Sequence, residues 1–251
     1  SAASDVYKRQ ALLNGLKVVG KDIRQVKLVT SGAGAAALAC IQLLVKLGLP
    51  RENIWVTDLA GLVYEGRTEL MDPDKAVFAQ KTEQRTLSDA IAGADVFLGL
   101  SAGGVLKKDM VAKMAAKPLI FALANPNPEI LPEDVKAVRD DAIMATGRTD
   151  YPNQVNNVLC FPYIFRGALD AGASTITDEM EIAAVHAIAE LAQAEQSEVV
   201  AAAYAGEKLA FGPEYLIPKP FDPRLMMKIA PAVAQAAAAS GVALRPVTDM
   251  E

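Results

Sequence analysis

The sequence predicts an α/β fold, a doubly wound and mostly parallel sheet with helices on both faces. Short β-rich apolar runs alternate along the chain with helical stretches, which is the pattern of β-α-β units. The runs end in glycine, proline, asparagine or aspartate, the residues that close strands and open turns. Four strands are predicted, over residues 26–30, 54–57, 96–100 and 119–124.

The first helix is predicted over residues 11–19, where leucine and valine recur at helical spacing before Gly20. Residues 1–10, SAASDVYKRQ, share no pattern with the rest of the chain, and we interpret them as an artefactual leader outside the fold. The strand at 26–30 leads through a glycine turn into an alanine- and leucine-rich helix that ends at Gly48.

The second strand ends at Asp58, and the next two end in the loops SAGG, residues 101–104, and NPNP, residues 125–128. Near the end of the chain, Thr177 and the pair Asp222-Pro223 open two helices. No internal repeat or low-complexity linker interrupts the pattern, so one domain is expected over residues 11–251.

The composition excludes several classes of function. The 251 residues include 25 basic and 30 acidic side chains, a formal net charge of −5, without a basic run, so a nucleic-acid partner is not expected. No apolar stretch is long enough for a bilayer and no signal peptide is recognised, so we expect no membrane partner and a cytoplasmic location. Cys40 and Cys160 lack paired spacing, which argues against a disulfide or a zinc site.

The chain offers little for metal or triad chemistry. His186 is the only histidine and falls within the apolar pattern of its helix, so we interpret it as structural. The closest carboxylate groupings, Asp140 with Asp141 and Glu179 with Glu181, lie in segments typical of solvated helix ends. No metal ligand is assigned.

The strongest functional signal is the glycine turn Gly32-Ala33-Gly34-Ala35. In the dinucleotide fingerprint of Rossmann-like sheets, the first glycine permits a tight turn and the second lets the backbone approach a pyrophosphate. The following helix directs its free N–H groups and positive dipole end at the phosphates. A purely structural glycine turn is the alternative. The context favours a cofactor, because the turn follows a strand, opens a helix and precedes Asp58 at the next strand end.

Asp58 suits a hydrogen bond to a ribose 2′-hydroxyl, which favours NAD, whereas the 2′-phosphate of NADP would need a cation such as Arg67. The loops 101–104 and 125–128 also follow strand ends, where α/β sheets bind ligands. Asn125 by itself is more typical of a turn residue, because its side chain bonds readily to its own backbone.

Several separated motifs agree in order and spacing with one family. They are ALLNGLKVVGKDI, SGAGAAALAC, NIWVTDLAGLVYEGR, FALANPNPEI, GRTDYPNQVNNVLCFPYIFRG and YLIPKPFDPRL. On these motifs the chain strongly resembles malic enzymes of the large bacterial type, because a generic dehydrogenase would share only the glycine turn. The resemblance implies oxidative decarboxylation of (S)-malate to pyruvate and carbon dioxide, with hydride passing to a nicotinamide cofactor and an Mg or Mn ion polarising the C2 oxygen.

The resemblance also assigns residues. The glycine turn would hold the cofactor phosphates, and Asn125 and Asn157 would each contact the nicotinamide side or malate, which reverses the interpretation of Asn125 as a turn residue. Large bacterial members usually use NADP despite an aspartate at the position like Asp58, so the resemblance favours NADP over NAD.

The family's catalytic tyrosine and lysine and its acidic Mg or Mn ligands lie upstream of the segment that resembles ALLNGLKVVGKDI. We therefore expect neither in this chain, and no turnover of malate by it. A phosphotransacetylase-like region would follow the last residues, and the full-length form is expected to be a homo-oligomer.

Two alternatives differ in class. One is a nucleotide-binding regulatory module that works through a partner without catalysis. The other is a dehydrogenase of amino or hydroxy acids, which has no reason to keep the NPNP and VNNV motifs together.

Overall fold

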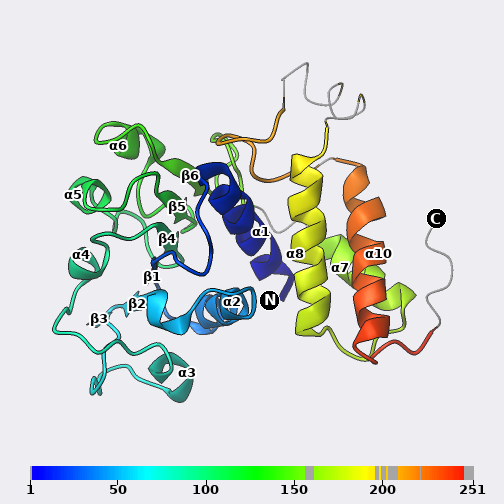
Figure 1. Ribbon diagram of the computed structural model, residues 1–251, viewed down its shortest axis with the longest axis horizontal. Helices are drawn as coiled ribbons and strands as arrows, with labels where there is room; N and C mark the ends of the chain where they lie inside the picture. Colours follow the sequence, from blue (N-terminus) through cyan, green and yellow to red (C-terminus); the bar gives the residue numbers. More distant parts are fainter. Residues whose placement is uncertain are drawn as a thin grey trace. The chain divides into compact units, whose positions relative to one another are not determined.

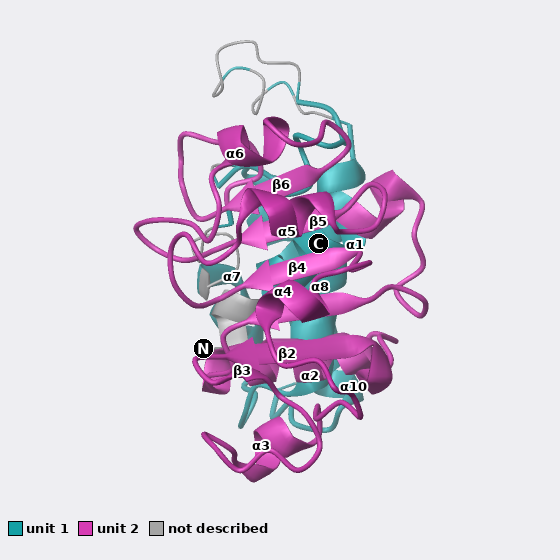
Figure 2. Ribbon diagram, turned by 90° about the vertical axis from the view of Figure 1, so that its left-hand side faces the viewer, with its two compact units in different colours: residues 1–14, 155–251 teal, residues 15–154 magenta. Residues whose placement is uncertain are grey.

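The structure is a computed structural model that describes residues 2–155, 161–195, 198, 202, 209–220 and 222–245. The chain divides into two compact units, where the sequence indicated one domain over residues 11–251 (Figure 2). One unit is formed by Gly15–Gln154, and the other by Ser1–Asn14 together with Val155–Glu251.

The unit of residues 15–154 is built on a six-stranded sheet of order β3-β2-β1-β4-β5-β6. All neighbouring strands run parallel except β2 and β3, which are antiparallel. The predicted doubly wound, mostly parallel sheet is therefore confirmed. The strands are β1 (Leu28–Ser31), β2 (Ile54–Asp58), β3 (Gly61–Leu62), β4 (Val96–Gly99), β5 (Leu119–Ala122) and β6 (Ile143–Thr146).

Side-chain alternation along the strands creates two apolar faces, and helices cover both (Figure 1). On one face Val29, Phe97 and Ile120 form a buried cluster with residues of the helical segments between the strands. Those segments include α4 (Leu87–Ala90), α5 (Lys108–Ala112) and α6 (Pro132–Lys136), while α2 (Ala35–Lys46) covers the opposite face. The short η1 (Arg51–Asn53) and α3 (Pro73–Ala76) complete the unit.

Two strands were not predicted from the sequence, because each is short and has a weak sequence pattern. β3 has two residues and pairs only at Thr57↔Leu62 and Asp58↔Gly61, where it turns the chain back across the end of β2. β6 has the sequence IMAT and follows only a short connection after α6. The four predicted strands all form.

The other unit consists of packed helices. They are residues 2–14 of α1 (Ala2–Val19), which continues into the sheet unit, together with α7 (Phe161–Asp170), α8 (Asp178–Gln193) and α10 (Arg224–Ala239). Gly167 allows α7 to approach α10, because a Cβ there would lie 2.8 Å from the Cβ of Val233. Thr177 caps α8 as predicted, with its hydroxyl accepting from the N–H of Met180.

The expectation that residues 1–10 lie outside the fold differs from the structure. Residues 2–10 form the first half of α1, and Val6, Tyr7, Arg9 and Gln10 are buried. Arg9 Nη1 donates to Glu181 Oε2 at 3.0 Å, and the Gln10 amide donates to a backbone carbonyl. Because this segment buries polar side chains through specific partners, it lacks the apolar periodicity that the sequence analysis used to recognise helices.

Two further residues of this unit differ from expectation. Glu181 is largely buried, with 13% of its side chain exposed against Arg9, rather than solvated. His186 is exposed on α8 and does not lie on its apolar face. It lines a groove with Glu190 of the same helix and Lys228 of α10.

Candidate cofactor-binding site

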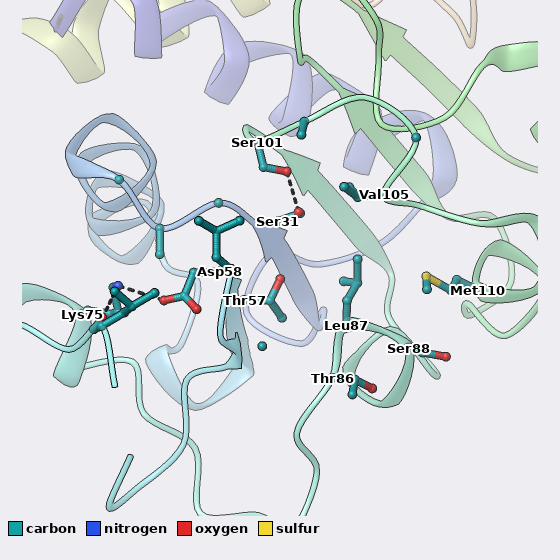
Figure 3. Close-up of a pocket in the computed structure, with 18 of the residues that line it drawn as sticks. Ser31, Thr57, Asp58, Lys75, Thr86, Leu87, Ser88, Ser101, Val105 and Met110 are labelled. Carbon is teal, nitrogen blue, oxygen red and sulfur yellow. Dashed lines mark hydrogen bonds and ion pairs between the residues drawn. The ribbon is translucent and has the colours of Figure 1, made fainter. Parts of the chain in front are cut away.

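A cavity of about 1140 Å³ opens at the carboxyl ends of β1, β2 and β4 (Figure 3). Parallel strands direct their carboxyl ends to one edge, and α/β sheets bind ligands there. The walls are the glycine turn, the end of β2, the loop after β4, and the starts of α3 and α4. Ser31, Thr57 and Ser101 contribute polar groups, while Leu87 and Met110 form an apolar side.

The glycine turn is built for close backbone approach. Gly32 has φ +106°, and a Cβ there would lie 2.7 Å from the carbonyl oxygen of Leu100, so no other residue fits. Gly34 is the N-cap of α2, in an extended conformation and without a side-chain cap. No atom lies within 4 Å of a Cβ built on Gly34, and Gly34 lines the cavity, so this uncapped helix start lies beside open space.

Asp58 is held by three donors at the end of β2. Its Oδ1 accepts from the N–H of Ala60 at 2.9 Å, and its Oδ2 accepts from Lys75 Nζ at 2.8 Å and from Arg67 Nη2. Burial alone would raise the pKa of Asp58, but the hydrogen bonds from Arg67 and Lys75 outweigh it and hold the pKa below its ordinary value. The carboxylate of Asp72, which accepts the backbone N–H of Lys75 at 2.8 Å, also lines the cavity, so Arg67 and Lys75 lie near two carboxylates at this end.

The two cations have different surroundings. Arg67 also donates to the carbonyls of Gly61, Leu62 and Glu69, so its guanidinium is committed to the loop around β3. Lys75 lines the cavity and donates to Asp58 and to one backbone carbonyl. An ammonium has three donors, so Lys75 retains one for a ligand. The sequence indicates Arg67 as a candidate phosphate cation but contains no signal for Lys75, because α3 has four residues and no periodic pattern.

The structure places the sequence-predicted residues in three groups. Gly32, Ala33, Gly34 and Asp58 line the cavity, and Ala35 follows as the first residue of α2. Asn125 is exposed at the same edge but outside this cavity, and a Cβ on Gly147 would lie 2.9 Å from its side-chain oxygen. Asn157 lies outside the described residues.

Glu129 is a further residue of this edge that was not predicted from the sequence. Its carboxylate is fully buried at the carboxyl edge of the sheet, where it accepts N–H groups from the loops after β4 and β5. In the sequence, a glutamate after NPNP is an ordinary polar residue, and only the tertiary fold reveals its contacts.

Residues 8–203 match the protein family described as malic enzyme, NAD binding domain. The chain belongs to this family. It is 66% identical over 241 residues to the NAD-dependent malic enzyme of Rhizobium meliloti strain 1021, covering 96% of this chain and 31% of that protein. It is 63% identical over 247 residues to the NADP-dependent malic enzyme of Escherichia coli strain K12, covering 98% and 32%.

Solved structures agree with this malic enzyme assignment. The malic enzyme of Entamoeba histolytica superposes with a TM-score of 0.87 at 34% identity, over 100% of this chain and 50% of that one. The malic enzyme of Pyrococcus horikoshii gives 0.84 at 37% identity, over 98% and 55%. The chain spans about a third of the length of the curated relatives it matches.

The residues of this malic enzyme domain fit a dinucleotide. Gly34 leaves room for a phosphate before α2, and the cavity joins an apolar wall to polar groups and Lys75. In the described ranges no group of three histidine, cysteine or acidic residues is arranged to hold a metal ion. Within the same ranges, no helix is long and apolar enough to cross a membrane.

Proposed function

We propose that this chain is the cofactor-binding part of a malic enzyme that converts (S)-malate to pyruvate and carbon dioxide with reduction of NADP. One observation carries the proposal: in a chain of this family, the uncapped start of α2 faces a cavity at the carboxyl edge of the sheet. Backbone amides at such a helix start are suited to a pyrophosphate.

Each part of the site has a role in this proposal. The amides of residues 32–35 hold the phosphates, and the apolar wall around Leu87 and Met110 accepts the adenine. Asn125 contacts the nicotinamide side or malate, and the resemblance gives Asn157 the same role. Hydride acceptance at C4 of the nicotinamide is the chemistry that the cofactor supplies when bound.

The charge around the ribose supports NADP over NAD. The relatives do not decide this, because an NAD-dependent and an NADP-dependent enzyme are similar to the chain at 66% and 63% identity. Asp58 would repel a 2′-phosphate if it were alone, but Arg67 and Lys75 pair with its carboxylate and neutralise its charge. Lys75, with a donor remaining, pairs with the 2′-phosphate.

Isothermal titration calorimetry of the chain with NADP and NAD tests the proposal. We expect both to bind, with the lower Kd for NADP. Binding of neither cofactor would overturn the cofactor role, and equal Kd values would overturn only the preference. A longer form that includes the regions found in the relatives should also reduce NADP when malate is added.

A further inference from the structure

Glu129 joins two loops at the carboxyl edge of the sheet. Its Oε1 accepts the N–H of Ser101 at 3.1 Å, and its Oε2 accepts the N–H of Ala124 at 3.1 Å. Ser101 begins the loop after β4, and Ala124 immediately precedes Asn125 in the loop after β5. Because the side chain is 0% exposed, no solvent competes for these bonds.

The same two loops are in contact along their backbones. The N–H of Leu106 donates to the carbonyl of Glu129 at 3.1 Å, and the N–H of Gly104 donates to the carbonyl of Pro128 at 3.1 Å. A Cβ on Gly103 would lie 2.8 Å from the Cβ of Asn127. A displacement of the Glu129 carboxylate would therefore move both loops together.

Gly99, the last residue of β4, leaves space for this carboxylate because it has no side chain. A Cβ on Gly99 would lie 2.6 and 2.7 Å from the two carboxylate oxygens of Glu129, well inside van der Waals contact. Gly99 does not have a positive φ, so its glycine is explained by space and not by backbone conformation.

The loop held by Glu129 reaches the glycine turn. The hydroxyl of Ser101 lies 2.6 Å from the hydroxyl of Ser31, which immediately precedes Gly32, and both serines line the cavity (Figure 3). In a doubly wound sheet one mononucleotide half binds beside β1 to β3 and the other beside β4 to β6. The loop after β5, which carries Asn125, belongs to the half that does not hold Asp58, whereas the loop after β4 lines the cavity together with Asp58.

We propose that Glu129 is a positioning residue that fixes the loops after β4 and β5 for the nicotinamide half of the cofactor. This inference rests on the proposed function. Glu129 does not line the cavity, so it acts through Ser101 and the backbone before Asn125. Burial raises the pKa of Glu129 even though the N–H groups of Ala124 and Ser101 lower it. A buried carboxylate at this position therefore costs folding free energy.

The substitution Glu129→Gln tests this role at nearly constant shape. Glutamine has one acceptor oxygen and an NH2 group, so one of the two loop N–H groups loses its acceptor. We expect the Kd of NADP to rise about tenfold, the equivalent of about 1.4 kcal/mol for an unsatisfied N–H. The Kd of adenosine 2′,5′-bisphosphate, which lacks the nicotinamide half, should rise clearly less than the Kd of NADP.

A matched control uses another acidic residue that accepts a backbone N–H. Asp141 accepts from the N–H of Lys117 at 2.7 Å and precedes β6, at the amino end of the strands. Asp141→Asn should leave the Kd of both ligands unchanged. Gly99→Ala keeps Glu129 but displaces its carboxylate, and should reproduce the selective loss of NADP affinity. If Glu129→Gln does not fold, as judged by circular dichroism, Gly99→Ala carries the test.

The outcomes separate the two proposals. The positioning role is overturned if Glu129→Gln and Gly99→Ala both bind NADP with the affinity of the parent chain. It is also overturned if both variants lose affinity for NADP and for adenosine 2′,5′-bisphosphate to the same extent. In either case the proposed function stands. Binding of neither ligand by the parent chain overturns the proposed function, and this inference with it. A loss of affinity for NADP that is larger than the loss for adenosine 2′,5′-bisphosphate supports the positioning role of Glu129.

Discussion

At the scale of single residues, the ribose end of the site depends on how three charges are arranged. Asp58 is the residue that the sequence indicates for a 2′-hydroxyl, and taken alone it favours NAD. In the structure its carboxylate is already bound by Arg67 and Lys75, with side-chain exposures of 10%, 3% and 9% respectively. The specificity therefore depends on the set of charges, in which Lys75 is the cation that lines the cavity.

Lys75→Met should weaken NADP binding about tenfold and leave NAD binding within about threefold, because a charge-assisted hydrogen bond to the 2′-phosphate is lost. Titration calorimetry with both cofactors measures the ratio. Lys108→Met is the matched control, since Lys108 is exposed, pairs with Asp134 at 3.2 Å and lies outside the cavity. An equal loss of NADP and NAD affinity in Lys75→Met would contradict the assignment.

Asp58→Asn should destabilise the chain in a pH-dependent way. The variant leaves Arg67 and Lys75 without their carboxylate, at a cost of about 2 kcal/mol near neutral pH. The pKa of Asp58 is lowered in the folded state, so its contribution is present above the ordinary value of 3.8 and is lost as the pH falls through the folded-state pKa. Urea unfolding of parent and variant at several pH values should show the difference narrowing on acidification, and a constant difference would count against the ion pairs.

At the scale of elements, the missing side-chain cap at the start of α2 affects both the stability of the helix and its capacity to bind an anion. A helix start without a side-chain cap is less stable than a capped one, but its free N–H groups can bind an anion. Gly34 leaves this helix start uncapped in a position where a side chain would meet no steric obstacle. We infer that the open cap serves binding and not folding.

Gly34→Asp should separate these two properties. The aspartate caps α2 and adds a negative charge at its positive end, so the melting temperature should stay equal or rise, by the equivalent of a few tenths of a kcal/mol. The same charge occupies the pyrophosphate position, so NADP affinity should fall by about a hundredfold or more. Gly34→Asn caps without charge and should lose less affinity. Retained binding in Gly34→Asp would show that the phosphates lie elsewhere.

At the scale of the whole molecule, features with a short-range sequence pattern were predicted, and residues whose role depends on tertiary contacts were not. The four main strands, the glycine turn and the Thr177 cap each have a short-range pattern, and all form as predicted. Lys75 and Glu129 have no such pattern, because the partners that place them in the site, Asp58 and Ser101, lie 17 and 28 residues away in the chain. The polar first turns of α1 were missed for the same reason, since Arg9 meets Glu181 only after folding.

We expect the chain as a whole to bind the cofactor without turning over malate, because the family that it matches is described as the NAD binding domain of malic enzyme. Saturating NADP should stabilise it by about 2.7 kcal/mol at a hundredfold excess over Kd, seen as a higher melting temperature. Absorbance at 340 nm should not rise when malate and a divalent cation are added with NADP. A malate-dependent rise would show that these residues suffice for catalysis.

The central claim is that backbone amides at the start of α2 bind the cofactor pyrophosphate, and amide NMR of the 15N-labelled chain tests it most directly. Addition of NADP should shift the amide resonances of Gly32, Gly34 and Ala35 strongly, and inorganic pyrophosphate should shift the same three. NADP binding that leaves these three resonances unmoved would contradict the account.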